Sequence, residues 1–334
     1  MMVTEADWAQ LEDESHPSGV VTLRLFPRSP HDIFIAVRHP VRQRMLILRV
    51  PDRAAEEFAR KHGQLPETRG LHLQFAPAQP GTRELQVTLT ENVRCEVFNP
   101  LVTDMAETAQ SAPTAAEALE TALERFNQWR NLLQTLAVSG LDVQARRGLF
   151  GELYILRKLL QAGVAQQEAL NAWTGPNGTS QDFQFPRLAV EVKTGTAVQP
   201  QSLVIANERQ LDDTGVRHLV LSHLSLDERR GGTGQSLRSL VDELRSLLHS
   251  SARPMLDNQL ARVGYLAEHV DLYEEPRYTV RALRLWHVSG DFPRITEHEL
   301  RPGVGECRYS ISTAGLEPYS LSEHDLLSML KENG

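Results

Sequence analysis

Short segments that alternate apolar and polar residues dominate the first hundred residues. Val, Ile, Thr and aromatic residues are enriched in these segments, and Pro, Gly, Asp and Asn separate them, which predicts β-strands joined by turns. The predicted strands cover 20–26, 32–37, 44–50, 71–76, 84–90 and 93–98. A helix at 51–63, ended by Gly63, interrupts them. We therefore expect 1–110 to be a β-rich α+β module that serves binding or assembly.

A second pattern begins after this module. Residues 101–112 show no clear periodicity and are predicted to form a loop, whereas 114–137 has apolar residues at helical spacing. Trp129 belongs to the apolar stripe, so we interpret it as a core residue. The segment 111–142 is therefore predicted to be a linking helix that leads into a central domain.

The central domain is predicted to cover 143–252. Its periodicities give a helix at 145–163, two short strands within 180–195, a strand at 202–207, a short helix at 208–213 and a strand at 216–226, before a helix at 236–250. This order of elements, αβββαβ, predicts a compact α/β core with a mixed sheet and helices on both of its faces. The overall class is α/β, or α+β when the first module is included. Residues 253–334 are predicted to be an α+β extension that packs on this core or continues its sheet.

The stretch 180–195, SQDFQFPRLAVEVKTG, contains the strongest chemical signal. Side chains alternate between the faces of a strand, so Glu191 and Lys193 share one face of the second arm of a hairpin. Asp182 and Gln184 share a face of the first arm. If the arms pair, two carboxylates and an ammonium meet on one polar face, which suits a divalent metal and a water beside a phosphate. The opposite face is apolar and consists of Phe183, Phe185, Val190 and Val192.

Glu152 is an acid with apolar neighbours on both sides of its helix. An unpaired buried carboxylate costs several kcal/mol, so a metal, an arginine or backbone donors should accompany it. Glu152 is either part of the same polar site or a boundary residue that pairs with Arg147 or Arg157. The sequence leaves both readings open.

Composition limits how such a site could be used. The 334 residues carry a formal net charge of −8, whereas proteins that bind nucleic acid by charge alone tend to be basic. We therefore expect another subunit to assist any DNA binding. The two distant cysteines, the lack of a leader and the lack of an apolar run of about 18 residues predict a cytoplasmic protein without a membrane partner. The basic segment 229–232 is read as a surface loop that could touch a DNA backbone.

The order αβββαβ, with Glu152 on the first helix, Asp182, and Glu191-Val192-Lys193 in a hairpin, resembles the PD-(D/E)XK nuclease superfamily. The stretches GLFGELYILRKLL and DFQFPRLAVEVKT are similar to those of the bacterial "PD-(D/E)XK motif protein" family of restriction or phage-defence nucleases. Gln181 stands where the family has its proline.

This resemblance implies a Mg²⁺ site, with Mn²⁺ as a substitute. Asp182, Glu191 and the backbone carbonyl of Val192 would be ligands, Glu152 would hold a second metal or orient a water, and Lys193 would hold the attacking water. Gln184 and Gln210 are weaker candidates for positioning. The implied partners are DNA, a helicase-like or MutL-like ATPase and a DNA methyltransferase, and a homodimer is left open.

Two functions of different class follow. The first is a Mg²⁺-dependent DNA endonuclease within a bacterial restriction or phage-defence system, with Asp182, Glu191, Lys193 and Glu152 as its catalytic residues. The second is a non-catalytic assembly or DNA-docking subunit that retains the nuclease fold. Metal binding and metal-dependent cleavage distinguish them.

Overall fold

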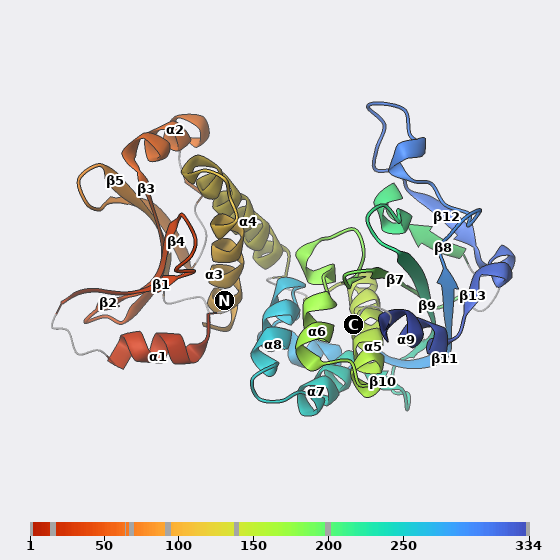
Figure 1. Ribbon diagram of the computed structural model, residues 1–334. Helices are drawn as coiled ribbons and strands as arrows, with labels where there is room; N and C mark the ends of the chain where they lie inside the picture. Colours follow the sequence, from red (N-terminus) through yellow and green to blue (C-terminus); the bar gives the residue numbers. More distant parts are fainter. Residues whose placement is uncertain are drawn as a thin grey trace. The chain divides into compact units, whose positions relative to one another are not determined.

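The computed structural model describes residues 3–13, 18–63, 65–66, 70–90, 95–136, 140–197 and 202–331. The chain forms two compact units, each with its own sheet (Figure 1). The first unit comprises Met1–Gly140 and Asp257–Ala267, and the second comprises Leu141–Leu256 and Glu268–Gly334. Helices and mixed or antiparallel sheets occur in both units, which confirms the predicted α/β class.

The first unit is built on a five-stranded antiparallel sheet in the order β1-β2-β3-β5-β4. Its strands lie in the segments whose alternation of apolar and polar residues predicted strands. Leu, Ile and Val side chains fill one side of the sheet. The strands are β1 (Gly19–Leu25), β2 (Asp32–His39), β3 (Gln43–Pro51), β4 (Leu71–Pro77) and β5 (Thr82–Leu89).

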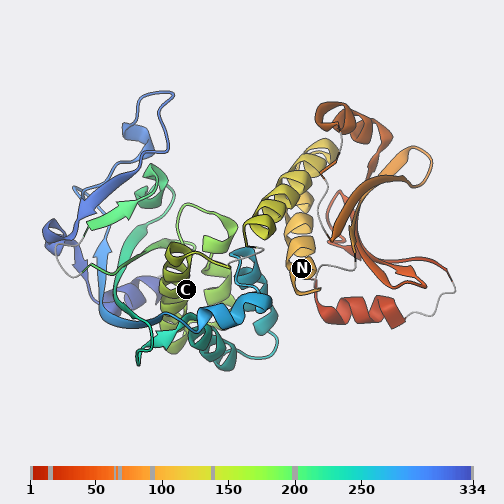
Figure 2. The same cartoon turned by 180° about the vertical axis from the view of Figure 1, so that it is seen from behind.

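Helices accompany this sheet, and the long pair α3 and α4 runs side by side along it (Figures 1 and 2). Asp104 on α3 joins the pair, because its carboxylate lies 2.6 Å from Arg125 Nη2 and accepts a 3.0 Å hydrogen bond from Trp129 Nε1. Trp129 is only 3% exposed and is a core residue, as predicted. The helices are α1 (Glu5–Asp13), α2 (Asp52–His62), α3 (Cys95–Gln110) and α4 (Ala115–Leu136).

Helix α3 corrects two predictions, the strand at 93–98 and the loop at 101–112. Residues 93 and 94 lie outside the described part of the chain, and a helix runs from Cys95 to Gln110. Phe98, Leu101, Val102 and Met105 recur at helical spacing and are buried. Packing against α4 therefore outweighs the β-like alternation of 93–98.

The second unit contains a mixed sheet in the order β10-β11-β9-β7-β6, with β13 paired to β11. Strands β7 and β9 are parallel and the other pairs are antiparallel, so the mixed character that was predicted is confirmed. The strands are β6 (Phe183–Gln184), β7 (Leu188–Gly195), β9 (His218–Arg229), β10 (Gln235–Ser236), β11 (Arg277–His287) and β13 (Ser320–Leu321).

The third predicted core strand, 202–207, does not join this sheet. Strand β8 (Ser202–Ile205) pairs with β12 (Tyr309–Ser312) in a separate two-stranded sheet. Leu203 and Ile205 are buried in an apolar cluster with residues of β9 and β11, so β8 lies over a face of the main sheet. Strand β9 pairs with β7 on one side and with β11, from the predicted extension, on the other, so the extension continues the core sheet.

Helices α5 (Val143–Gln161) and α7 (Leu237–Leu247) pack together, and α5 also contacts β7 (Figure 1). Asp142 caps α5 by accepting a 2.8 Å hydrogen bond from the Ala145 N–H. Gly151 lets the helix approach the sheet, because a Cβ there would collide with Thr194 Cγ2. Further helices include α6 (Gln166–Ala172), the short 3₁₀ helix η2 (Glu208–Leu211) and α9 (Glu323–Lys331), and α8 (Arg253–Arg262) begins in this unit and ends in the first.

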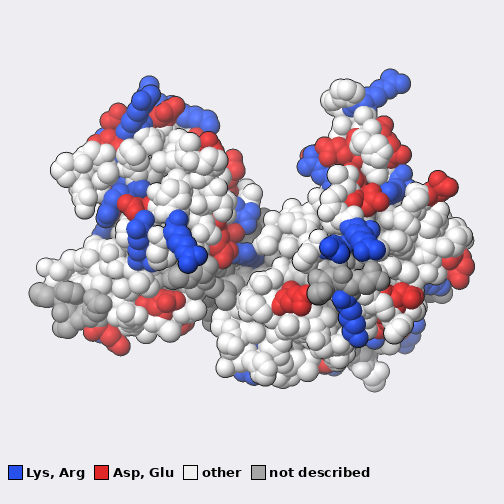
Figure 3. Space-filling view, in the orientation of Figure 1, with Lys and Arg blue, Asp and Glu red and all other residues white. Residues whose placement is uncertain are grey.

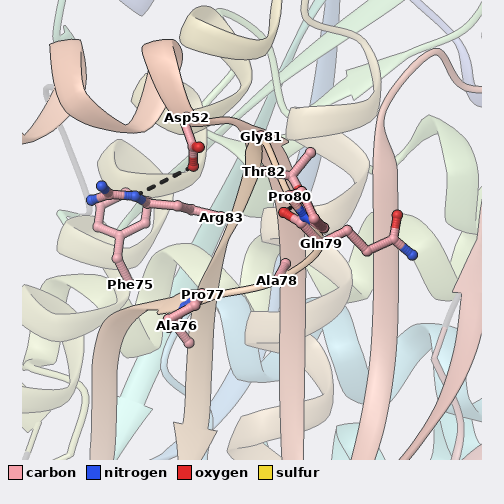
Figure 4. A pocket seen from close by; sticks show the side chains of 10 residues that line it. All are labelled: Asp52, Phe75, Ala76, Pro77, Ala78, Gln79, Pro80, Gly81, Thr82 and Arg83. Carbon is pink, nitrogen blue, oxygen red and sulfur yellow. Dashed lines mark hydrogen bonds and ion pairs between the residues drawn. The ribbon is translucent and has the colours of Figure 1, made fainter.

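Surface features locate no site by themselves. On the face shown in Figure 3, acidic and basic side chains are interspersed in both units. A hollow of about 600 Å³ in the first unit is lined by Asp52, Phe75 and residues 76–83, and Arg83 Nε lies 3.5 Å from Asp52 Oδ1 in its wall (Figure 4). It contains none of the predicted site residues. Within the described ranges, every helix is too short or too polar to cross a membrane.

Candidate metal and phosphate site

The predicted hairpin is present and consists of β6 and β7. Phe183 lies opposite Val190 and Gln184 opposite Ala189, and the Phe185 N–H donates a 2.7 Å hydrogen bond to the Leu188 carbonyl. The apolar side is buried as expected, since the exposed fractions of Phe183, Phe185, Val190 and Val192 are all 8% or less. This core fixes the direction in which the polar side chains project.

Asp182 lies immediately before β6. Its Oδ2 accepts a 2.7 Å hydrogen bond from the Val192 N–H. Its main-chain oxygen accepts hydrogen bonds from the N–H groups of Thr174 and Gly175, at 2.8 and 2.9 Å. The short length of β6 is what leaves the Val192 N–H to the carboxylate rather than to a strand neighbour.

Glu191 and Lys193 project to the same face, as the period of a strand requires. Lys193 Nζ lies 2.7 Å from Glu191 Oε1 and donates a 2.9 Å hydrogen bond to Gln210 Oε1. Glu191 is 1% exposed, and its Oε2 is buried without a hydrogen-bond partner among the described residues. A buried carboxylate oxygen in that state is suited to a cation.

Glu152 belongs to the same site. Arg147 pairs with Glu228 and Arg157 with Glu243, at 2.6 and 2.7 Å, so neither arginine takes the role of partner that the alternative reading gave it. The Trp173 indole N–H instead donates a 2.8 Å hydrogen bond to Glu152 Oε2.

Gly175 shows how closely the acids converge. A Cβ built on Gly175 would lie 2.7 Å from Glu152 Oε2 and 3.2 Å from Asp182 Oδ1. The two carboxylates therefore face the same small space, which a side chain at position 175 would fill. Asp182, Glu191, Lys193 and Glu152, predicted separately from a hairpin and a helix, are brought together in one place.

Burial raises the pKa values of all three carboxyl groups, and repulsion by Asp182 adds to this effect for the two glutamates. Burial, followed by the charge of Asp182, raises the pKa of Glu152 to about 8. The same two causes raise the pKa of Glu191 well above its ordinary value. Burial also raises the pKa of Asp182, against the hydrogen bond from Val192. The site holds three acids beside one ammonium and therefore favours an additional positive charge.

The donor set fits a hard divalent cation, because carboxylate oxygens are the ligands that Mg²⁺ and Mn²⁺ prefer. Asp182, Glu191 and Glu152 would hold it, and Glu191 Oε2 is the orphaned oxygen that such an ion would satisfy. No three His, Cys, Asp or Glu side chains of the described ranges already stand in ligand geometry, and Lys193 occupies Glu191 Oε1. The carbonyl of Val192 stays a predicted ligand.

Three residues of the site were missed or undervalued from the sequence. Trp173 and Gly175 lie in the connection between α6 and β6, where no periodicity pointed to them. Gln181, at the family's proline position, is 7% exposed and donates hydrogen bonds to the main-chain oxygens of Arg209 and Asp212, at 2.8 and 3.4 Å. It thereby ties η2 to the hairpin. Gln184 donates to Gln181 Oε1, and no contact of its side chain with the carboxylates is found in the described ranges.

Comparison with known protein families matches residues 4–314 to a family described as "Putative PD-(D/E)XK family member, (DUF4420)". The match covers both units and includes Glu152 and the whole hairpin. No curated protein and no solved structure matches the chain.

Proposed function

Because the chain belongs to the PD-(D/E)XK family DUF4420, we propose that it is a Mg²⁺-dependent nuclease that hydrolyses phosphodiester bonds in DNA. The observation that carries the proposal is the convergence of Glu152 and Asp182 on the space beside Gly175, next to the ion-paired Glu191 and Lys193. Three carboxylates with raised pKa values in one buried place are costly to a protein, and a cation-dependent reaction explains why they are kept.

Each side chain has a distinct task in this proposal. A bound divalent cation supplies positive charge to the phosphate and acidifies water. Asp182, Glu191 and Glu152 hold that cation, with the Val192 carbonyl as a further ligand. The Val192 N–H orients Asp182 through its 2.7 Å hydrogen bond, and Trp173 orients Glu152 through its 2.8 Å hydrogen bond.

Lys193 would act on the substrate side of the site. Its ammonium is held between Glu191 Oε1 and Gln210 Oε1, at 2.7 and 2.9 Å. From there it can position the attacking water and offset the negative charge that develops on the phosphate. Two fixed acceptors reduce the entropy that a long lysine side chain loses when it acts.

DNA as the substrate, and a bacterial restriction or phage-defence system as the setting, are also part of this proposal. The net charge of −8 argues that partner subunits contribute to DNA binding. A helicase-like or MutL-like ATPase and a DNA methyltransferase are the partners we propose.

A cleavage assay tests the proposal. Purified protein is incubated with DNA and Mg²⁺ or Mn²⁺, alone and with the products of neighbouring genes. We expect cleavage that is lost in Asp182→Ala and in Lys193→Ala and kept in Lys158→Ala, a control that removes a half-buried lysine paired with Glu323 on α9. Equal cleavage by the wild type and both site variants would show that the site is wrongly assigned.

The alternative function, a non-catalytic assembly or DNA-docking subunit, makes the opposite prediction for metal binding. It expects no Mg²⁺ or Mn²⁺ binding in calorimetry. The buried oxygen of Glu191, which has no hydrogen-bond partner among the described residues, favours the enzyme. Binding that disappears in Glu191→Gln would exclude the alternative.

A further inference from the structure

The face of the sheet that bears Glu191 and Lys193 continues across two more strands. Lys193 on β7 lies opposite His223 on β9, and His223 lies opposite Arg284 on β11. Residues paired across neighbouring strands project to the same face. Lys193, His223 and Arg284 therefore form one row that leads away from the carboxylates.

The middle of this row is an uncharged aromatic floor. His223 is 1% exposed and stacks with Trp286, with ring centroids 6.3 Å apart. Gly195 makes room for this ring, because a Cβ there would lie 3.0 Å from His223 Nε2. Burial, followed by the charge of Arg284, lowers the pKa of His223 to about 4, so the ring is neutral at physiological pH.

The far end of the row is cationic. A β-bulge separates Val280 from Ala282, and Arg281 within it reaches across β9 to the Thr196 carbonyl at 3.1 Å and to Asp227 Oδ1 at 2.8 Å. Arg229 shares the same aspartate at 2.7 Å. Arg284 is exposed and forms no hydrogen bond or ion pair with any described residue.

We propose that Arg284, with Arg281 beside it, binds backbone phosphates of a nucleic-acid strand that crosses β7, β9 and β11 from the Lys193 site. This inference rests on the proposed function and adds a substrate path to it. Neighbouring β-strands lie about 4.8 Å apart, so the backbones at Lys193 and Arg284 are about 10 Å apart. Both side chains can therefore contact the same nucleic-acid strand. An arginine fork matches the geometry of a phosphate.

Charge selects the occupant of this row. Lys193 is ion-paired with Glu191, and Arg229 and Arg281 share the single carboxylate of Asp227. The guanidinium of Arg284 is available in a protein that is acidic overall. Arg284, together with the two guanidinium groups that share Asp227, therefore leaves positive charge at this end of the row, and positive charge attracts a polyanion.

Binding measured without divalent metal tests the row separately from cleavage. Fluorescence anisotropy with labelled duplex DNA, single-stranded DNA and RNA, in EDTA and between about 50 and 200 mM salt, gives the slope of log K against log salt. We expect Arg284→Gln to weaken binding and to reduce the magnitude of the slope by about 1, the loss of one phosphate contact. Arg284→Lys should keep the slope. The three probes show which nucleic acid is preferred.

Arg42→Gln is the matched control, because it removes an exposed arginine from the first unit and should leave the slope unchanged. The inference is overturned if Arg284→Gln has the same slope of log K against log salt as the wild type. It is also overturned if the wild type shows no salt-dependent binding of any probe. If Arg284→Gln binds normally while Asp182→Ala loses cleavage, the phosphate-binding role of Arg284 is wrong and the proposed nuclease function is supported. If Arg284→Gln weakens binding and the wild type never cleaves, the phosphate-binding role of Arg284 is supported and the proposed nuclease function is wrong.

Discussion

Lys193 Nζ donates a 2.9 Å hydrogen bond to Gln210 Oε1, which also accepts a 2.8 Å hydrogen bond from the Ala206 N–H. Gln210 lies in η2, and the amide of Gln181 ties η2 to the start of the hairpin. The lysine is therefore held by an element outside its own strand. Its position depends on residues 181, 193 and 210 together.

We expect Gln210→Ala to lower kcat about tenfold and to leave KM nearly unchanged. The loss of one hydrogen bond to a charged group corresponds to about 1.5 kcal/mol, and Gln210 acts through Lys193 rather than on the substrate. Gln210→Glu keeps an acceptor oxygen and should recover most of kcat. A rise in KM alone, or no recovery by Gln210→Glu, would contradict this positioning role.

Stability should fall with rising pH in metal-free buffer. Glu152 has a folded-state pKa of about 8, against an ordinary value of 4.5. The folded state therefore holds a proton that the unfolded state loses between these values, and the free energy of unfolding decreases over that window. Each unit of pKa shift corresponds to about 1.4 kcal/mol. Chemical denaturation at several pH values in EDTA measures this dependence.

Glu152→Gln is the matched variant for that experiment. It removes the titrating group and keeps an acceptor for the Trp173 indole. The variant should lose part of the pH dependence and be more stable than the wild type at pH values near 8. An unchanged dependence would show that the Glu152 carboxyl keeps an ordinary pKa in the folded protein.

Divalent cations should reverse the cost of the buried acids. We expect Mn²⁺ to raise Tm, because a ligand at about 100 times its Kd adds about 2.7 kcal/mol to the stability. The shift should be larger at high pH, where the carboxyl groups release their protons more readily. Asp182→Asn should abolish it in thermal scans. An equal shift in Asp182→Asn would place the cation elsewhere.

Gly175 and Gly148 allow a paired test of the space between the carboxylates. Gly175→Ala places a Cβ 2.7 Å from Glu152 Oε2, and we expect it to cost about 1–3 kcal/mol of stability and most of the metal-induced shift. Gly148 lies in α5, and a Cβ there would have no described neighbour within 4 Å. Gly148→Ala should stabilise the helix by about 0.5–1 kcal/mol and leave metal binding unchanged. Similar metal binding by both variants would argue against a shared space.

Local patterns were sufficient to predict much of the site. The period of two put Glu191 and Lys193 on one face, and the apolar residues opposite them indicated which face would be polar. The period of the preceding helix marked Glu152 as an acid among apolar neighbours. These are properties of short segments, and the buried residues of the hairpin and of α5 confirm the pattern. Whether these residues catalyse a reaction stays a prediction.

The sequence did not predict which β-strands distant in the chain pair with one another. The alternation in 202–205 predicts a strand equally well whether it joins the main sheet or pairs with β12, and only the packing of Leu203 and Ile205 decides. Helix α3 was misread because 93–98, which includes the first turn of the helix, alternates apolar and polar residues.

The sequence by itself determined which residue types share a face within each segment, because side-chain direction follows from the backbone period. Only the tertiary structure decided that Trp173 is the partner of Glu152, that Gly175 leaves space between two acids, and that Lys193, His223 and Arg284 form one row. Those relations join residues distant in the chain. They depend on which strands pair and which helices pack, and the free energy of the whole core sets that choice.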